Sequence, residues 1–475
     1  MPLLTRRRLL QGGLALSALA LGLPLARARA AEPRLLTAGP GEALLLEAGQ
    51  PETRTWLYDG VSPGPIIRAR QGEEVFVRLK NELPQPTTIH WHGIRIDNAM
   101  DGVAHLTQEA VPPGGTFDYR FTVPDAGTFW YHPHDRSWEQ VARGLYGLLI
   151  VEEAGPIAQA FDQDIAIVAD DWRLGEDGQI EEASFAHMMD WSHAGRLGNT
   201  LTLNGQDQLD IPVTKGERIR LRLCNTCNAR ILELRIEHPD IWVVAEDGQP
   251  VPPRELDDGY IVLSPGERAD LIVDMTLARG STAAITEVSA GQSLLAGQLT
   301  YHPANEVQHV APWPLPPRAL PDNPLSTDLD LAGAQAVELL LEGGAMGNMA
   351  QATYQGETLA IRELVGKGQV WALNGTAGMT DRPLFTAPRG QTVTVDLRND
   401  TAWPHAMHFH GHHFKVVERN GKPTNSEAWK DTVLLERLES AKIAFVADNP
   451  GKWMIHCHML EHQAAGMTTW FKVEA

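Results

Sequence analysis

The 475-residue chain has a formal net charge of -20, with 21% charged and 43% hydrophobic residues. Its length exceeds what one hydrophobic core usually serves and predicts about three domains. The negative charge argues against a nucleic acid or an anionic membrane surface as partner, because both would repel it.

The first 30 residues are predicted to be an export signal. Residues 5–10 contain three consecutive arginines and resemble a twin-arginine motif, and an apolar run follows to about Leu25. A membrane anchor is the alternative, but the run is shorter than the ~20 residues that a membrane span needs. We expect the twin-arginine machinery to export the folded chain to the periplasm, with residues 1–30 removed and no membrane anchor left.

Three segments share one pattern, at residues 72–81, 216–225 and 390–399. Each starts with Gly and ends with Asn, and the third, fifth and seventh residues after the Gly are aliphatic. This period of two predicts a strand with one buried face. The repeat distance is too long for a solenoid and indicates three copies of one β-domain. Short strands separated by Gly and Pro predict an all-β chain of three Greek-key β-sandwiches.

The domain boundaries follow from these copies. The first domain is predicted at residues 31–153, the second at 156–303 and the third at 330–475. Residues 304–329 form the connector, and six prolines between Pro312 and Pro324 make it stiff and extended.

Four His-X-His pairs lie in the first and third copies. At the positions that correspond to His90 and His92, the second copy has the aliphatic residues Leu234 and Ile236. Strand alternation puts both imidazoles of a pair on one face. Ordinary buried histidines are the alternative for a single pair, but the matched spacing argues against it for all four. Eight imidazoles are too many for one metal ion and suit a cluster between the first and third domains. The pairs are His90/His92, His132/His134, His408/His410 and His456/His458.

The second copy contains a Cys-X-X-Cys motif at Cys224 and Cys227. No second pair completes a zinc site, and no thioredoxin-like pattern surrounds the motif. We therefore expect a structural disulfide or two plain thiols rather than a redox centre. Helical turns are expected at residues 170–173 and 185–191.

In the third copy, Cys457 stands between His456 and His458. If this segment is a strand, the thiol points to one face and both imidazoles point to the other. One strand then serves two metal centres, joined by a few covalent bonds.

Cys457 also has the partners of a blue-copper electron-transfer site, which takes one Cys, two His and a weak axial Met. His462 and Met467 follow it closely, and His405 supplies the second imidazole. Zinc is the alternative, but it prefers four strong donors and has little use for a thioether.

Over essentially its whole mature length the chain resembles the three-domain multicopper oxidases, the family of laccases and bacterial periplasmic cuprous oxidases. The matching motifs are at residues 90–93, 132–134, 405–411 and 456–458. The resemblance implies cupredoxin-like domains and four copper ions. Type 1 copper would take His405, Cys457, His462 and axial Met467, type 2 copper His90 and His408, and the type 3 pair His92, His132, His134, His410, His456 and His458.

The resemblance also implies that a small reductant, phenol-like or Cu(I), gives up single electrons at the type 1 site, close to the surface through His462 or His405. Four electrons would reduce dioxygen to two waters. Asp101 stands where the family has an acid near the cluster, with an ordinary turn residue as the alternative. Gln463 stands where some cuprous oxidases carry a proton-donating Glu, and Glu461 is a candidate substitute.

Other features of the resemblance concern the reductant. The family's cuprous oxidases carry a long Met-rich insert that this chain lacks, which favours aromatic reductants. Residues 429–433 match a segment of those enzymes and are interpreted as structural. Soft donors that could hold Cu(I), with packing as the alternative, are His187, Met188, Met189, His193, Met346 and Met349.

Two other functions stay open for a chain expected to be a monomer. One is a copper-binding storage or tolerance protein without turnover. The other is a copper-free cell-division scaffold of the same fold, against which the complete set of twelve ligands counts strongly.

Overall fold

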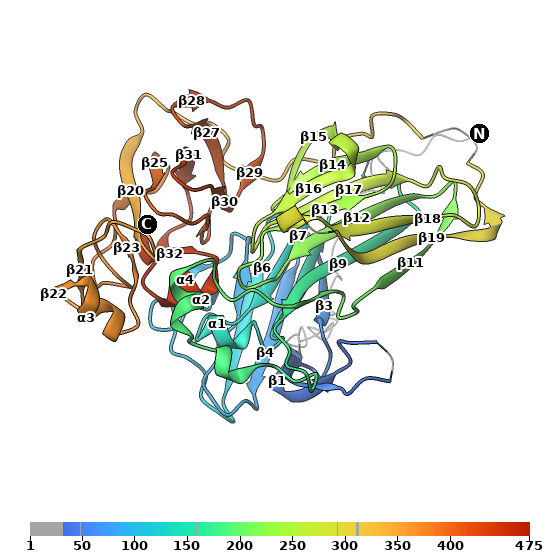
Figure 1. Cartoon of the computed structure of the whole chain (residues 1–475). Coiled ribbons are helices and arrows are strands. Elements are labelled where there is room, and N and C mark those ends of the chain that lie inside the picture. The colour runs from blue at the N-terminus through green and yellow to red at the C-terminus, as the bar shows by residue number, and fades with distance from the viewer. Residues whose placement is uncertain (1–31, 48, 158–159, 292, 310–312) are drawn as a thin grey trace, which may run out of the picture.

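The computed structural model describes residues 32–47, 49–157, 160–291, 293–309 and 313–475. The predicted export signal lies outside these residues. None of the described helices combines the length and apolar character needed to cross a membrane. Strands dominate the fold (Figure 1), which confirms the predicted all-β class.

The first domain packs two four-stranded sheets around a core that includes Leu36, Val77 and Leu149. One sheet has the order β2-β1-β4-β6, with β1 (Arg34–Ala43), β2 (Thr53–Tyr58), β4 (Glu74–Asn81) and β6 (Thr116–Thr122). The other has the order β3-β8-β7-β5, with β3 (Gly64–Arg70), β5 (His90–His92), β7 (Gly127–His132) and β8 (Gly147–Glu152).

The second domain pairs a six-stranded with a five-stranded sheet. The six-stranded sheet, β10-β9-β12-β17-β14-β15, contains β9 (Gln163–Trp172), β10 (Thr200–Leu203), β12 (Arg218–Asn225), β14 (Ile241–Glu246), β15 (Gln249–Glu255) and β17 (Arg268–Asp274). The five-stranded sheet, β11-β19-β18-β13-β16, contains β11 (Leu209–Lys215), β13 (Leu232–Ile236), β16 (Tyr260–Leu263), β18 (Thr282–Glu287) and β19 (Leu294–Glu306).

The third domain follows the same plan. Its larger sheet, β23-β20-β25-β31-β27-β28 with β29 beside β27, contains β20 (Gln335–Gly343), β23 (Trp371–Leu373), β25 (Gln391–Asn399), β27 (Phe414–Arg419), β28 (Lys422–Pro423), β29 (Trp429–Lys430) and β31 (Ser440–Ala447). The facing sheet, β24-β33-β32-β26-β30, contains β24 (Thr386–Pro388), β26 (His405–Phe409), β30 (Thr432–Leu435), β32 (Gly451–Cys457) and β33 (Thr468–Glu474). A separate hairpin joins β21 (Gln351–Tyr354) to β22 (Glu357–Ala360).

The described helices are short, and three of them meet where the domains join. Helices α1 and α2 both lie against α4, and each belongs to a different domain (Figure 1). The α-helices are α1 (Ser137–Gln140), α2 (Met188–Ser192), α3 (Ile361–Gly366) and α4 (Leu460–Ala464). Single 3-10 turns are η2 (Asn98–Met100), η3 (Glu182–Ser184), η4 (Asp257–Gly259) and η5 (Ser289–Gly291).

The repeated pattern forms the same strand in each domain. β4, β12 and β25 each pair parallel with the first strand of their domain and antiparallel with a later one. The prediction of one buried face is wrong for β12, which is buried along its whole length. Its alternate residues Arg218, Arg220 and Arg222 are covered because each guanidinium is paired with a carboxylate.

Two local predictions resolve differently. The helical turn expected at residues 170–173 is wrong, because Asp170 to Trp172 end β9 and pair with β10, so sheet pairing overrides the turn-like composition. The turn expected at 185–191 corresponds in part to α2.

Cys224 and Cys227 are two buried free thiols, not a disulfide. Burial raises the pKa of both thiols, which fits inert side chains.

The buried ion pairs of the second domain give a stability prediction. Asp270 accepts hydrogen bonds from Arg220 Nη2 at 2.6 Å and Arg222 Nη1 at 3.2 Å, and all three side chains are buried. Asp270→Ala leaves buried positive charge without this partner and should cost about 3–5 kcal/mol, measured as a lower thermal midpoint. Asp118→Ala, which removes an exposed pair with Arg78, should have a far smaller effect; equal effects would contradict the prediction.

Candidate metal centres

The structure brings the four histidine pairs together between the first and third domains. Within the first domain β5 pairs with β7 so that His90 lies opposite His132. Within the third, β26 pairs with β32 so that His408 lies opposite His456. All eight imidazoles are buried, and each domain contributes four.

Two stacked imidazole pairs cross the boundary between the domains. His90 of the first domain stacks on His410 of the third, with ring centroids 3.9 Å apart. His92 stacks on His408 at 3.8 Å, with an interplanar angle of 12°. Neither domain alone can form this arrangement.

The hydrogen bonds of these rings fit a metal cluster. The Nδ1–H groups of His90, His132 and His408 donate to backbone carbonyls at 2.8, 3.0 and 2.9 Å. The Nε2 atom of each of these three rings is buried without a hydrogen-bond partner in the described structure. Unpartnered buried polar atoms are costly, and a bound metal ion explains them.

Other imidazole nitrogens face one another directly. His456 Nε2 lies 3.2 Å from His410 Nε2 and 3.3 Å from His134 Nε2. Burial, followed by the neighbouring imidazoles, holds the pKa of all three rings well below the ordinary value. They are therefore neutral, which is the form that binds metal ions.

Asp101, predicted as an acid near the cluster, contacts one stacked pair. Its carboxylate accepts a hydrogen bond from His410 Nδ1 at 3.0 Å and lies 3.2 Å from His90 Nδ1. A single carboxylate thus joins an imidazole of the third domain to one of the first.

A second carboxylate, Asp431, contacts the other stacked pair and was missed as a site residue. Its Oδ1 atom lies 3.1 Å from His92 Nε2 and 3.4 Å from His408 Nδ1. The segment 429–433 was noticed in the sequence but interpreted as structural. Only the pairing of His408 with Thr432 across β26 and β30 brings Asp431 to the cluster, and that register has no local sequence signal.

The single-metal site forms on the other face of β32. Cys457 Sγ lies 3.6 Å from His405 Nδ1 and 3.6 Å from His462 Nδ1, and these two nitrogens are 3.0 Å apart. Met467 is fully buried in the same hydrophobic core, and its carbonyl accepts a hydrogen bond from Cys457 N at 3.1 Å. The Cys457, His405 and His462 donors are therefore gathered in one place, and Met467 belongs to the same core cluster as Cys457.

Burial raises the pKa of the Cys457 thiol to about 12. A thiol in this environment loses its proton only when a cation such as a metal ion compensates the charge. The donor set of Cys, two His and Met suits copper.

His462 and His405, through one of which the reductant is expected to reach the site, are both fully buried. His462 Nε2–H donates to the backbone carbonyl of His193 at 2.7 Å. His193 follows α2 of the second domain, so this segment covers the edge of the site. His405 Nε2 lies 2.9 Å from Thr401 Oγ1.

Two backbone carbonyls of this second-domain segment accept hydrogen bonds from the third domain. Trp371 Nε1 donates to the Trp191 carbonyl at 2.7 Å, and Ala345 N donates to the Ser192 carbonyl at 2.7 Å. The ring of His193 lies 5.1 Å from that of Trp403. Segments of two domains therefore separate His462 from solvent.

The remaining candidate residues lie outside both centres. Glu461 hydrogen-bonds to Asn228 Nδ2 at 2.8 Å, and burial raises its pKa to about 7. The side-chain hydrogen bond described for Glu461 runs to the second domain and not to the histidine cluster, so its proton-donating role stays a prediction. Of the soft donors, Met188 and Met349 pack against hydrophobic clusters, whereas Met189 and Met346 are exposed.

Cupredoxin-like domains with buried histidine and cysteine groups define a copper-binding protein. Three family models described as multicopper oxidase match residues 43–155, 163–285 and 352–475. The multicopper oxidase MmcO of Mycobacterium tuberculosis is 30% identical over 459 residues, covering 89% of this chain and 84% of that protein. The chain belongs to the multicopper oxidase family, and copper is its cofactor.

Solved structures agree with this assignment. A multi-copper oxidase from Pseudomonas thermotolerans is 32% identical with a TM-score of 0.80, covering 93% of this chain and 99% of that one. Lac15 from a marine microbial metagenome is 39% identical with a TM-score of 0.73, covering 94% of this chain and 100% of that one. The shared architecture therefore extends over nearly the whole chain.

The single-metal site gives a spectroscopic prediction. Copper-loaded protein should be blue, and Cys457→Ser should abolish the colour because it removes the thiolate beside His405 and His462. The copper of the histidine cluster should be largely retained, measured as metal content. Equal colour in the variant would disprove the assignment.

Proposed function

We propose that this chain is a periplasmic oxidase that couples one-electron oxidation of phenolic or other aromatic reductants, or Cu(I), to the four-electron reduction of dioxygen to water. It acts as a monomer after export by the twin-arginine route. The proposal rests on one observation above all: two buried donor sets share the strand β32, with Cys457 directly between His456 and His458.

The proposed ligand sets follow this geometry. Four copper ions, when bound, supply the one-electron and dioxygen chemistry. The type 1 ion would be held by His405, Cys457, His462 and Met467, the type 2 ion by His90 and His408, and the type 3 pair by His92, His132, His134, His410, His456 and His458.

The chain's own contribution is placement. Strand alternation turns Cys457 toward one site and His456 toward the other, so a short covalent path joins the two. The Cys457 carbonyl also accepts a hydrogen bond from His456 Nδ1 at 2.9 Å, which fixes that ring. Asp101 is a carboxylate at the cluster that can hold a proton needed for water formation.

The reductant is proposed to contact the second-domain segment around His193, which lies over His462, rather than the His462 imidazole itself. The hydrogen bond from His462 Nε2 to the His193 carbonyl supplies a route for electrons through the second-domain segment. Trp403 and His193 are half-buried aromatic rings at this surface and suit an aromatic reductant. The exposed Met346 is the feature that favours Cu(I) instead.

Oxygen uptake separates this function from copper storage. A storage protein would bind copper in the same residues but consume no dioxygen with a phenol or Cu(I). The copper-free scaffold has little support, because eight buried imidazoles without metal would leave many nitrogens unpartnered.

Replacing one cluster histidine tests whether His456 and His458 belong to the histidine cluster and not to the Cys457 site. His458→Ala should keep the blue colour, because the Cys457 site is intact, but oxygen uptake should be lost. His456→Ala should behave in the same way. Oxygen uptake equal to that of the unmodified protein in either variant would show that strand alternation was misinterpreted.

A second test identifies the reductant. Fully loaded enzyme should oxidise a methoxyphenol without added copper, because the aromatic cover accepts it, and Cu(I) should also be oxidised. The comparison is turnover with and without excess Cu(II), with Met346→Ala/Met349→Ala as a matched variant that should leave phenol turnover unchanged. Strict dependence on excess copper that is lost in the double variant would make this a copper-detoxifying oxidase.

A further inference from the structure

Asp431 contacts a residue of each of the three domains next to the histidine cluster, namely His92, Arg268 and His408. It lies between β29 and β30, and its backbone carbonyl accepts a hydrogen bond from His408 Nδ1 at 2.9 Å. Its carboxylate accepts one from His92 Nε2 at 3.1 Å. One buried residue therefore holds an imidazole from the first domain and one from the third.

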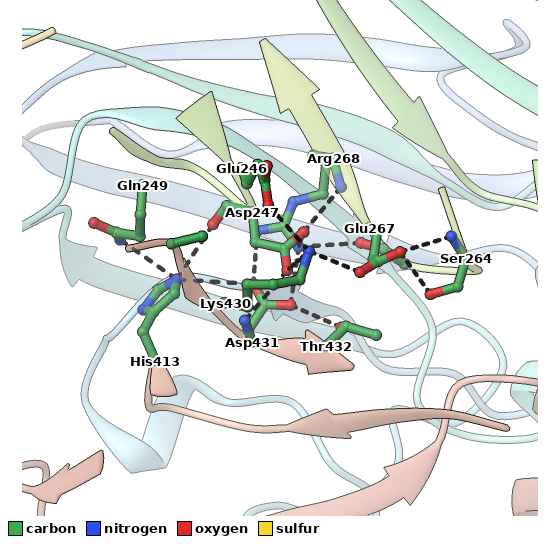
Figure 2. Close-up of polar contacts among 12 residues, drawn as sticks. Glu246, Asp247, Gln249, Ser264, Glu267, Arg268, His413, Lys430, Asp431 and Thr432 are labelled. Carbon is green, nitrogen blue, oxygen red and sulfur yellow. Dashed lines mark hydrogen bonds and ion pairs between the residues drawn. The ribbon is translucent and has the colours of Figure 1, made fainter. Parts of the chain in front are cut away.

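The carboxylate of Asp431 is itself held by Arg268, the first residue of β17 in the second domain. Arg268 Nη2 donates to Asp431 Oδ2 at 2.7 Å and Nη1 donates to Oδ1 at 3.0 Å (Figure 2). The guanidinium also donates to the carbonyls of Gly266 at 3.0 Å and Thr128 at 3.2 Å. The guanidinium is therefore hydrogen-bonded to the backbone of both the first domain, at Thr128, and the second domain, at Gly266.

Further charges anchor the residue next to Asp431. The Lys430 ammonium lies 2.7 Å from Glu267 Oε1 and 3.4 Å from Asp247 Oδ2, both in the second domain (Figure 2). Asp247 Oδ1 accepts a hydrogen bond from the Arg268 backbone N at 3.0 Å. Buried charges are costly unless paired, so this network resists displacement of the segment.

The first domain is shaped around the same ion pair. Gly93 directly follows His92 and has φ +86°, in the left-handed region that favours glycine. A Cβ atom there would come within 2.2 Å of Arg268 Nη2 and 2.6 Å of Asp431 Oδ2. The glycine lets the His92 segment lie directly on the pair.

The contact has a specific effect on His92. Because its Nε2–H donates to Asp431, the atom left for a metal ion is Nδ1, which is buried without a hydrogen-bond partner in the described chain. His90, His132 and His408 present Nε2 instead. Without the Asp431 acceptor, the tautomer and the orientation of His92 are no longer fixed.

We propose that Arg268 and Asp431 are positioning residues, through which the second domain aligns His92 and His408 although it supplies no ligand. This inference rests on the proposed function for the assignment of the two histidines to copper. Loss of a hydrogen-bond partner behind metal ligands typically lowers metal affinity or activity about 10–100-fold.

The test compares two buried arginines of one sheet in the full-length, copper-loaded protein. Arg268→Gln removes the charge that holds Asp431. Arg218→Gln is the matched control, since Arg218 on β12 is also fully buried and donates to Asp274 Oδ2 at 2.6 Å. The contacts described for Arg218 do not include His92 or His408. The readouts are copper content, the paramagnetic resonance spectrum of type 2 copper, the blue colour and oxygen uptake.

We expect both variants to keep the blue colour, but only Arg268→Gln to change the type 2 spectrum or lose copper, with oxygen uptake about 10–100-fold lower. Arg268→Lys should restore part of the spectrum and the activity, because the charge returns. If Arg268→Gln does not fold, Asp431→Asn replaces it, with Asp274→Asn as control.

Identical copper content, type 2 spectrum and oxygen uptake in Arg268→Gln and Arg218→Gln would overturn the proposal. Failure of the proposed function gives a different result. In that case the unmodified protein consumes no dioxygen, while the copper content and the spectrum still report whether Arg268 positions the ligands.

Discussion

Eight imidazoles buried in one space between two domains are the constraint on which the structure depends. Burial lowers the pKa of seven of these rings. Hydrogen bonds from the Nδ1 atoms of His90, His132 and His408 leave their Nε2 atoms without a partner in the described structure. Such a concentration of unpartnered nitrogens is unfavourable without metal. Under the proposed function, copper bound in this space would help to hold the first and third domains together and would stabilise the docked arrangement by mass action.

The directions of the candidate ligand side chains on β32 could be predicted from the sequence, because they follow a short-range rule. Alternation along one strand separates Cys457 from His456 and His458, and the structure places their side chains as expected. The same period identified β4, β12 and β25 as equivalent strands. These features depend only on neighbours within a few residues, so no knowledge of the tertiary structure was needed.

The features that were missed all depend on contacts between distant segments. The buried outer face of β12 results from carboxylates on other strands. The role of Asp431 depends on the register of β26 with β30 and on Arg268 in another domain. The burial of His462 results from a second-domain segment far away in the chain. None of these has a local pattern, because each arises where domains pack together.

The hydrogen bond between His462 and the His193 carbonyl has an evolutionary consequence. The surface outside His462 is built from a segment that contacts His462 through its backbone. Substitutions in that segment can alter the shape and polarity met by an approaching molecule while the donors around Cys457 remain unchanged. Under the proposed function, diversification of specificity is thereby uncoupled from the redox machinery, and related chains can acquire new reductants without rebuilding their metal sites.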